Sequence, residues 1–139
     1  MRYSIFDDFY KIGIIPVLEI DSVQHARPLA EALLRGGLPV AEVTLRTEAA
    51  LESIRLIARN VPDVIVGAGT VMNRTQAEAA RDAEAQFLVC PGMIEEVVLW
   101  SDENQIPVLP GAVTPTASSR SRMLSRRIAL PPRKVQRWK

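Results

Sequence analysis

The feature that most constrains this chain is a regular alternation of short apolar runs with amphipathic segments between residues 13 and 109. The apolar runs have the length and composition of buried strands, whereas the segments between them carry apolar residues at helical spacing. The strand–helix unit recurs roughly every 20 to 25 residues, which is typical of parallel strands joined by right-handed helical crossovers. The sequence therefore predicts an α/β fold.

Five strands and four helices are expected within this pattern. We expect strands at residues 13–20, 40–47, 64–66, 86–90 and 106–109, and helices at residues 23–35, 48–59, 73–83 and 93–103. Residues 1–11 suit an irregular lead-in or a short helix. Pro28 predicts a kink or a later start for the first of the four helices. Thr47 is expected to cap the second, and Asn73 or Thr75 the third.

Two arrangements of parallel strands fit this order: an open doubly wound sheet, or part of an eight-stranded barrel. A complete barrel takes about 250 residues, and the 139 residues here supply five strands. The barrel interpretation therefore makes the chain a partial (β/α)₈ TIM barrel of about five βα units. In both arrangements the carboxyl ends of the strands meet on the side that binds ligands.

Residues 40–47 combine a strand pattern with charged side chains. Period two places Glu42, Thr44 and Arg46 on one face of this strand. That face is either a solvated side of an exposed sheet, or the lining of a barrel interior or cleft. In an interior, a glutamate can act as a general base and an arginine can bind a carboxylate with two hydrogen bonds.

Small or polar residues follow the other strands as well, and this convergence favours Glu42 and Arg46 as site residues. The run at 67–70, Gly-Ala-Gly-Thr, permits close approach of a ligand to the backbone and offers a hydroxyl group. Its two glycines lack the third glycine of a dinucleotide-binding fingerprint, so we expect no nicotinamide cofactor.

Composition narrows the class of protein. The single cysteine, Cys90, excludes an internal disulfide and a zinc site built from cysteines, and it favours a reducing, cytoplasmic location. No run approaches the roughly 18 apolar residues of a membrane span, and the amino-terminal residues show no secretory signal. Residues 1–116 carry a net charge of −7, whereas residues 117–139 carry +8 and no acidic residue.

Four motifs in register resemble those of one family. They are Glu-Val-Thr-Leu-Arg-Thr at 42–47, Val-Gly-Ala-Gly-Thr-Val at 66–71, Phe-Leu-Val-Cys-Pro-Gly at 87–92 and Ile-Pro-Val-Leu-Pro-Gly at 106–111. Together they look like the 2-keto-3-deoxy-6-phosphogluconate (KDPG) aldolases, with their 4-hydroxy-2-oxoglutarate and 6-phosphogalactonate relatives. The resemblance covers about residues 10–116, in the family's order and spacing.

The resemblance implies a class I aldolase of carbohydrate metabolism, a lyase that uses no cofactor or metal. Such enzymes are (β/α)₈ barrels, usually homotrimers. They form a Schiff base between a lysine and a small keto acid, and they cleave a 2-keto-3-deoxy-6-phospho sugar acid to pyruvate and glyceraldehyde 3-phosphate. No membrane partner is implied.

Roles for individual residues also follow from the resemblance. Glu42 takes the position of the family's general base, and Arg46 and Thr70 take positions that hold the pyruvate carboxylate. Further positions implied to line the site are Thr44, Gly69, Pro91 and Gly92. Cys90 stands where a serine is common, and we interpret it as a buried, inert thiol.

The sequence departs from the family after residue 116. The Schiff-base lysine, which lies on the sixth strand in a Lys-Phe-Phe-Pro-Ala-Glu context, is missing, so we expect residues 1–116 to form a partial aldolase domain that is inactive or crippled. Residues 117–139 form a basic tail, interpreted as disordered or out of frame. The alternatives are a non-catalytic fragment that assembles with itself or with a complementing chain, and a basic-tailed nucleic-acid binder.

Overall fold

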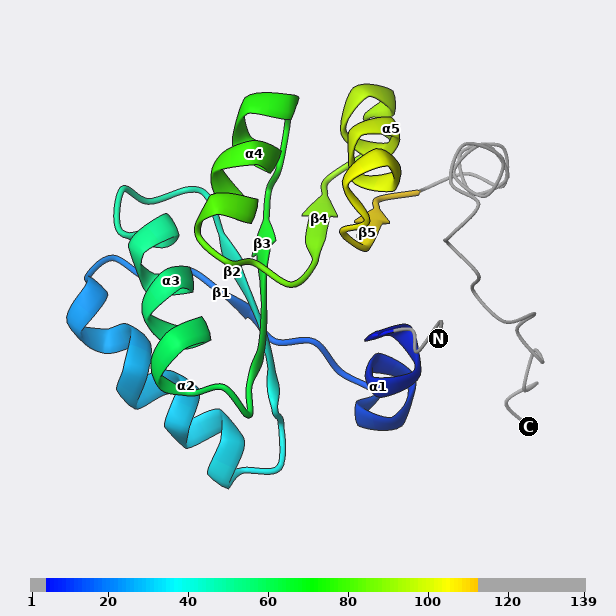
Figure 1. The fold of residues 1–139 in the computed structure, drawn as a ribbon. Helices are drawn as coiled ribbons and strands as arrows, with labels where there is room; N and C mark the ends of the chain where they lie inside the picture. Colours follow the sequence, from blue (N-terminus) through cyan, green and yellow to red (C-terminus); the bar gives the residue numbers. More distant parts are fainter. Residues whose placement is uncertain (1–4, 113–139) are drawn as a thin grey trace.

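The computed structural model describes residues 5–112, in which strands and helices alternate along the chain (Figure 1). In order, the elements are α1 (Ile5–Ile12), β1 (Val17–Leu18), the 3₁₀ helix η1 (Val23–His25), α2 (Ala26–Arg35), β2 (Val40–Thr44), α3 (Ala50–Asn60), β3 (Ile65–Gly69), α4 (Arg74–Asp82), β4 (Leu88–Cys90), α5 (Glu95–Asn104) and β5 (Val108–Pro110). The alternation confirms the predicted α/β class. The lead-in contains a short helix, α1.

The order of the strands decides between the two predicted arrangements. All five strands pair in parallel, and their order across the sheet is their order along the chain, β1-β2-β3-β4-β5. A doubly wound sheet contains a switch point at which the strand order reverses, and no such reversal occurs among these five strands. Figure 1 shows α2 to α5 arranged along one side of the sheet, with α1 apart from them. The fold is a partial barrel.

The side of the sheet that the helices cover holds the main hydrophobic core. Ala41 and Val43 of β2, and Val66 and Ala68 of β3, point to this side and are fully buried. α2 packs on α3, α3 on α4, and α4 on α5, so the helices form a continuous outer layer. Each fully buried valine contributes about 1.5–3 kcal/mol to folding.

The opposite, inner side of the sheet carries the polar residues of β2. The strand register pairs Glu42 with Gly67 and Thr44 with Gly69, so these four residues share one face. Only 9% of Glu42 is exposed, and all five residues of β2 are buried. The strand is therefore covered on both sides, and the interpretation of its polar face as a solvated surface is wrong.

The amino-terminal end of the inner face is filled by aromatic side chains. Phe87 lies fully buried beside Gly67, where a Cβ atom would come within 2.5 Å of the Phe87 ring. Phe9 of α1 packs edge-on against Phe87, with 4.8 Å between the ring centroids. Gly67 thus makes room for Phe87, and α1 covers that end of the inner face.

Two predicted elements differ from the observed ones. The strand predicted at 40–47 ends at Thr44, and Thr47 does not cap the following helix, which begins at Ala50. The Thr47 hydroxyl instead donates a hydrogen bond of 2.6 Å to the carbonyl oxygen of Ile20. The strand predicted at 13–20 contains only Val17 and Leu18.

The sequence correctly predicted several helix ends from capping residues, proline and glycine. Asn73 caps α4, since its side chain accepts a hydrogen bond from the backbone N–H of Gln76. The α-helix α2 begins at Ala26 after a 3₁₀ turn, so Pro28 lies in its first turn, where its missing N–H costs no hydrogen bond. Gly36 ends α2, and Gly37 follows with φ +80°.

The end of α5 suggests a stabilising substitution. Gln105 follows α5 with φ +61°, a left-handed conformation in which a side chain costs free energy and glycine does not. We expect Gln105→Gly to raise the free energy of unfolding by about 0.5–1 kcal/mol, measured by urea or thermal denaturation.

Gln24→Gly is the matched control, because Gln24 is also exposed but lies in the 3₁₀ helix η1 with a negative φ. This control should lower stability. A loss of stability in Gln105→Gly equal to that of the control would contradict the geometry at the end of α5.

Candidate functional site

The carboxyl ends of β2 and β3 lie side by side and carry the predicted site residues. The backbone N–H of Leu45 donates a hydrogen bond of 2.9 Å to the carbonyl oxygen of Gly69. Arg46 and Thr70 are the residues that come directly after this pair. The parallel pairing of two strands therefore places together two residues that are 24 positions apart in the sequence.

The Glu42 side chain lies against Gly69 on the inner face of the sheet. A Cβ atom added to Gly69 would overlap the Glu42 carboxyl group, so a larger residue at this position would force that side chain out of its observed place. Gly69 itself is fully enclosed at the end of β3. Gly69 leaves room for the Glu42 side chain near the carboxyl ends of β2 and β3.

Burial changes the acidity of Glu42. Loss of hydration raises the pKa of Glu42 above the ordinary value of 4.5, and the positive charge of Arg46 opposes this increase only in part. A carboxyl group with a raised pKa can exchange protons closer to neutral pH than an exposed glutamate. These are the properties that a general acid–base group requires.

Arg46 extends from the same edge and has a partner that the sequence did not suggest. Its Nη1 atom lies 3.6 Å from Oε2 of Glu19, and more than half of each side chain is exposed. Glu19 comes directly after β1, the neighbour of β2 in the sheet. The rule that polar residues after parallel strands converge could have identified Glu19, but the strand predicted at 13–20 included it.

Two threonine hydroxyls hold the end of β1 against the end of β2. Thr44 donates a hydrogen bond of 3.2 Å to the carbonyl oxygen of Leu18, and Thr47 donates one to Ile20. Thr44 is 1% exposed, so its hydroxyl has a structural role and joins the carboxyl ends of β1 and β2. These bonds extend the attachment of β1 beyond its two paired residues.

Thr70 adopts an unusual backbone conformation for its type. Its φ is +58°, which is rare for a β-branched residue, whereas the other non-glycine residues with positive φ among residues 5–112, Glu84 and Gln105, follow helices. Residues held in such conformations cluster at functional sites, because the surrounding structure must compensate for the strain. The geometry therefore adds support to Thr70 as a site residue.

Pro91 and Gly92 lie at the same edge of the sheet, after β4, where they neighbour β5. The N–H of Gly111 donates a hydrogen bond of 2.8 Å to the Cys90 carbonyl, and a Cβ atom on Gly111 would clash with the carbonyl of Pro91. Cys90 is buried, and desolvation raises its pKa to about 12, as expected for an inert thiol.

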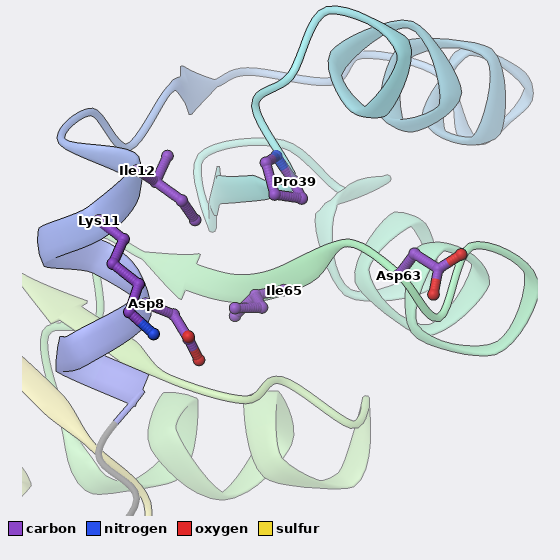
Figure 2. A pocket seen from close by; sticks show the side chains of 6 residues that line it. All are labelled: Asp8, Lys11, Ile12, Pro39, Asp63 and Ile65. Atoms are coloured by element: carbon purple, nitrogen blue, oxygen red, sulfur yellow. The ribbon is translucent and has the colours of Figure 1, made fainter.

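The single lysine within residues 5–112, Lys11, lies at the other end of the sheet. Figure 2 shows Lys11 on α1, facing the segments that lead into β2 and β3. The hollow there is lined by Asp8, Lys11, Ile12, Pro39, Asp63 and Ile65. Lys11 is therefore separated from Arg46 by the length of β2, roughly 15 Å for a five-residue strand.

Residues 5–112 contain neither a candidate metal site nor a candidate membrane span. No three histidine, cysteine, aspartate or glutamate side chains of this range come together as the ligands of a metal ion would. No helix of this range has both the length and the apolar character that crossing a lipid bilayer demands.

Comparison with known proteins gives a consistent result. Residues 5–126 match the family model described as KDPG and KHG aldolase. The 2-dehydro-3-deoxy-phosphogluconate aldolase of Dickeya dadantii is 50% identical over 101 residues, which are 73% of this chain and 47% of that enzyme. The chain thus spans about half the length of the curated relatives that it matches.

Solved structures agree with this assignment. The 2-keto-3-deoxy-6-phosphogluconate aldolase of Zymomonas mobilis ZM4, determined with 3-phosphoglycerate, has a TM-score of 0.75 at 39% identity over 79% of this chain and 52% of that chain. The KDPG aldolase of Legionella pneumophila, with pyruvate captured at low pH as a covalent carbinolamine intermediate, has a TM-score of 0.76 at 36% identity over 79% and 53% of the two chains.

The raised pKa of Glu42 predicts how stability depends on pH. Between the unfolded and folded pKa values the folded chain binds more protons than the unfolded chain, so stability falls as pH rises through this window. Glu42→Gln removes the cost of a buried charge. We expect this variant to melt at a higher temperature than the original chain at pH 7, with the difference shrinking as pH falls toward 4.

The exposed Glu48 provides a matched control, since Glu48→Gln removes a carboxylate from the same segment without removing a buried one. Thermal melts of all three proteins at several pH values would measure the effect. A Glu42→Gln variant that is less stable than the original chain at pH 7 would show that burial of Glu42 carries no such cost.

Proposed function

The chain belongs to the KDPG and KHG aldolase family, as its four motifs suggested, and we propose that residues 5–112 supply the acid–base and carboxylate-binding part of a class I aldolase site. The observation that carries the proposal is the buried carboxyl group of Glu42, with its raised pKa, beside Arg46 at the carboxyl edge of the sheet. The reaction is the cleavage of a 2-keto-3-deoxy-6-phospho sugar acid to pyruvate and glyceraldehyde 3-phosphate.

The substrate class is a small keto acid with a carboxylate. The Legionella relative was solved with pyruvate captured as a covalent intermediate, and the Zymomonas relative with 3-phosphoglycerate, which is also a three-carbon acid. In this chain the Arg46 side chain is 59% exposed, and its guanidinium group can form two parallel hydrogen bonds to such a carboxylate. Thr70, which follows the neighbouring strand, adds a hydroxyl donor at the same edge.

Glu42 moves the protons of the reaction. When the carbon–carbon bond of the protonated imine breaks, the hydroxyl group of the substrate loses a proton and becomes the carbonyl of the aldehyde. The electron pair of the broken bond neutralises the positive imine nitrogen, giving a neutral enamine. Glu42 accepts this proton through a water molecule and later returns one to the enamine carbon. A raised pKa suits both steps, because the group must be deprotonated for the first and protonated for the second.

The imine itself requires a lysine near the carboxyl ends of β2 and β3, where Glu42 and Arg46 lie. Lys11 lies at the opposite end of the sheet, and Lys134 and Lys139 fall outside the described residues. We propose that the Schiff-base lysine of an active site comes from outside residues 1–139, because neither Lys134 nor Lys139 stands in the family's Lys-Phe-Phe-Pro-Ala-Glu context. The 139-residue chain alone then holds a keto acid without cleaving it. Without a positioned, desolvated lysine there is no electron sink for the reaction.

An alternative function is assembly with a second polypeptide. Val17, on the inner face of the edge strand β1, is 62% exposed, and Ile14 is 63% exposed. Exposed apolar residues beside an unpaired strand edge favour association with another chain, either as a homo-oligomer such as the family's trimer or with a chain that supplies further strands. The hypothesis of a basic arm that binds nucleic acid concerns residues 117–139, outside the described residues.

Borohydride trapping tests the proposal. Treating the purified chain with pyruvate and sodium borohydride should leave no covalent adduct, because Lys11 lies away from the site and neither Lys134 nor Lys139 has the family's lysine context. Mass spectrometry of the intact chain and of its peptides would measure this. The Legionella KDPG aldolase, which was solved with pyruvate as a covalent carbinolamine intermediate, is the positive control when treated in parallel.

An adduct on Lys134 or Lys139 would contradict the proposal that the Schiff-base lysine is not part of this chain, since the chain would then carry its own nucleophile. If the chain works with a complementing polypeptide, mixing the two should produce an adduct that maps to a lysine of the partner. This outcome would favour the assembly hypothesis.

A further inference from the structure

Glu19 is the one charged residue at the carboxyl edge of the described sheet that contacts a proposed site residue and has no role in the proposed function. Its Oε2 atom lies 3.6 Å from Nη1 of Arg46. Glu19 follows β1, and Arg46 follows the adjacent parallel strand β2, so the contact joins two neighbouring strand ends. The pair therefore lies where the carboxylate of a keto acid is proposed to bind.

The hydrogen bonds around Glu19 show that its position is built into the fold. Thr44 donates to the carbonyl oxygen of Leu18, and Thr47 donates to that of Ile20. The residues before and after Glu19 are thus bound by residues that precede and follow Arg46. Ile20 is also 2% exposed and anchors this segment in the core. The backbone that carries Glu19 is held beside the backbone that carries Arg46.

The two side chains, in contrast, are free to separate. The Glu19 side chain is 55% exposed and that of Arg46 is 59% exposed, so water screens their attraction and the pair is weak. A carboxylate ligand that forms two hydrogen bonds with the guanidinium group makes a stronger contact than the 3.6 Å approach of Glu19. An incoming keto acid can therefore displace Glu19 at small cost.

We propose that Glu19 is a positioning residue, which holds Arg46 at the proposed site and competes with the carboxylate of the keto acid for it. This inference rests on the proposed function for the identity of the competing ligand. Glu19 then sets the affinity of the site, because part of the charge of Arg46 is balanced before the ligand arrives. Removing the negative charge of Glu19 should free Arg46 and strengthen keto acid binding.

Chemical modification of Arg46 tests both parts of this inference. Phenylglyoxal reacts with free guanidinium groups, and peptide mass spectrometry can measure the rate at Arg46 in the full 139-residue chain. We expect Glu19→Gln to raise this rate about threefold, and to lower about threefold the pyruvate concentration that gives half-protection. Both differences should shrink at high salt, which screens an exposed ion pair.

Asp21→Asn is the matched control, because Asp21 is an exposed acid only two residues away. It should behave like the original chain, and Glu19→Asp should restore slow modification in part. Thermal melts establish that each variant is folded. Glu19 is exposed and glutamine is nearly isosteric with it, so no loss of the fold is expected.

The outcomes separate the inference from the proposed function. If Arg46 in Glu19→Gln reacts at the same rate as in the original chain and in Asp21→Asn, the positioning role is overturned. If the rate rises but pyruvate protects Arg46 in no variant, the pairing is supported and the proposed carboxylate site is contradicted. Faster reaction together with tighter protection supports both.

Discussion

The two glycines on the inner face of β3, Gly67 and Gly69, are the constraint on which the rest of the site depends. Gly67 leaves space for Phe87, which receives Phe9 of α1 and fills the amino-terminal end of the inner face. Gly69, two residues later on the same face, leaves space for the carboxyl group of Glu42. The glycines of β3 thus leave space for packed aromatic side chains at one end and for an ionisable group at the other.

The position of Glu42 lowers stability at neutral pH, at a residue to which we assign proton transfer only as a proposal. Placing a carboxyl group in a covered strand deprives it of water, and Arg46 compensates for that loss only in part. Arg46 in turn lies near two carboxylates, because Glu19 approaches it from the end of β1. The charge of Arg46 thus lowers the pKa of the buried acid in part, and in the proposed site the same side chain also contacts the ligand.

Much of this arrangement could be predicted from local pattern, and the remainder depends on contacts between distant segments. The period-two alternation of β2 was enough to place Glu42 and Thr44 on one face, because strand geometry depends only on neighbouring residues. Arg46 lies beyond the end of this strand at Thr44, so the alternation does not account for its position. Thr47 was predicted to be a helix cap, yet its hydroxyl binds Ile20, 27 positions away, which no local pattern reports. Glu19 was missed because β1 is only two residues long, and an apolar run does not mark where pairing stops.

The central claim is that the carboxyl ends of β2 and β3 form a binding site for a keto acid. The most direct measurement is a titration of the ¹⁵N-labelled chain with pyruvate, followed by backbone amide chemical shifts. The account predicts saturable shifts confined to residues around Arg46, Gly69 and Thr70. Shifts that appear instead around Lys11 and Ile65, at the opposite end of the sheet, or no shifts at all, would contradict it.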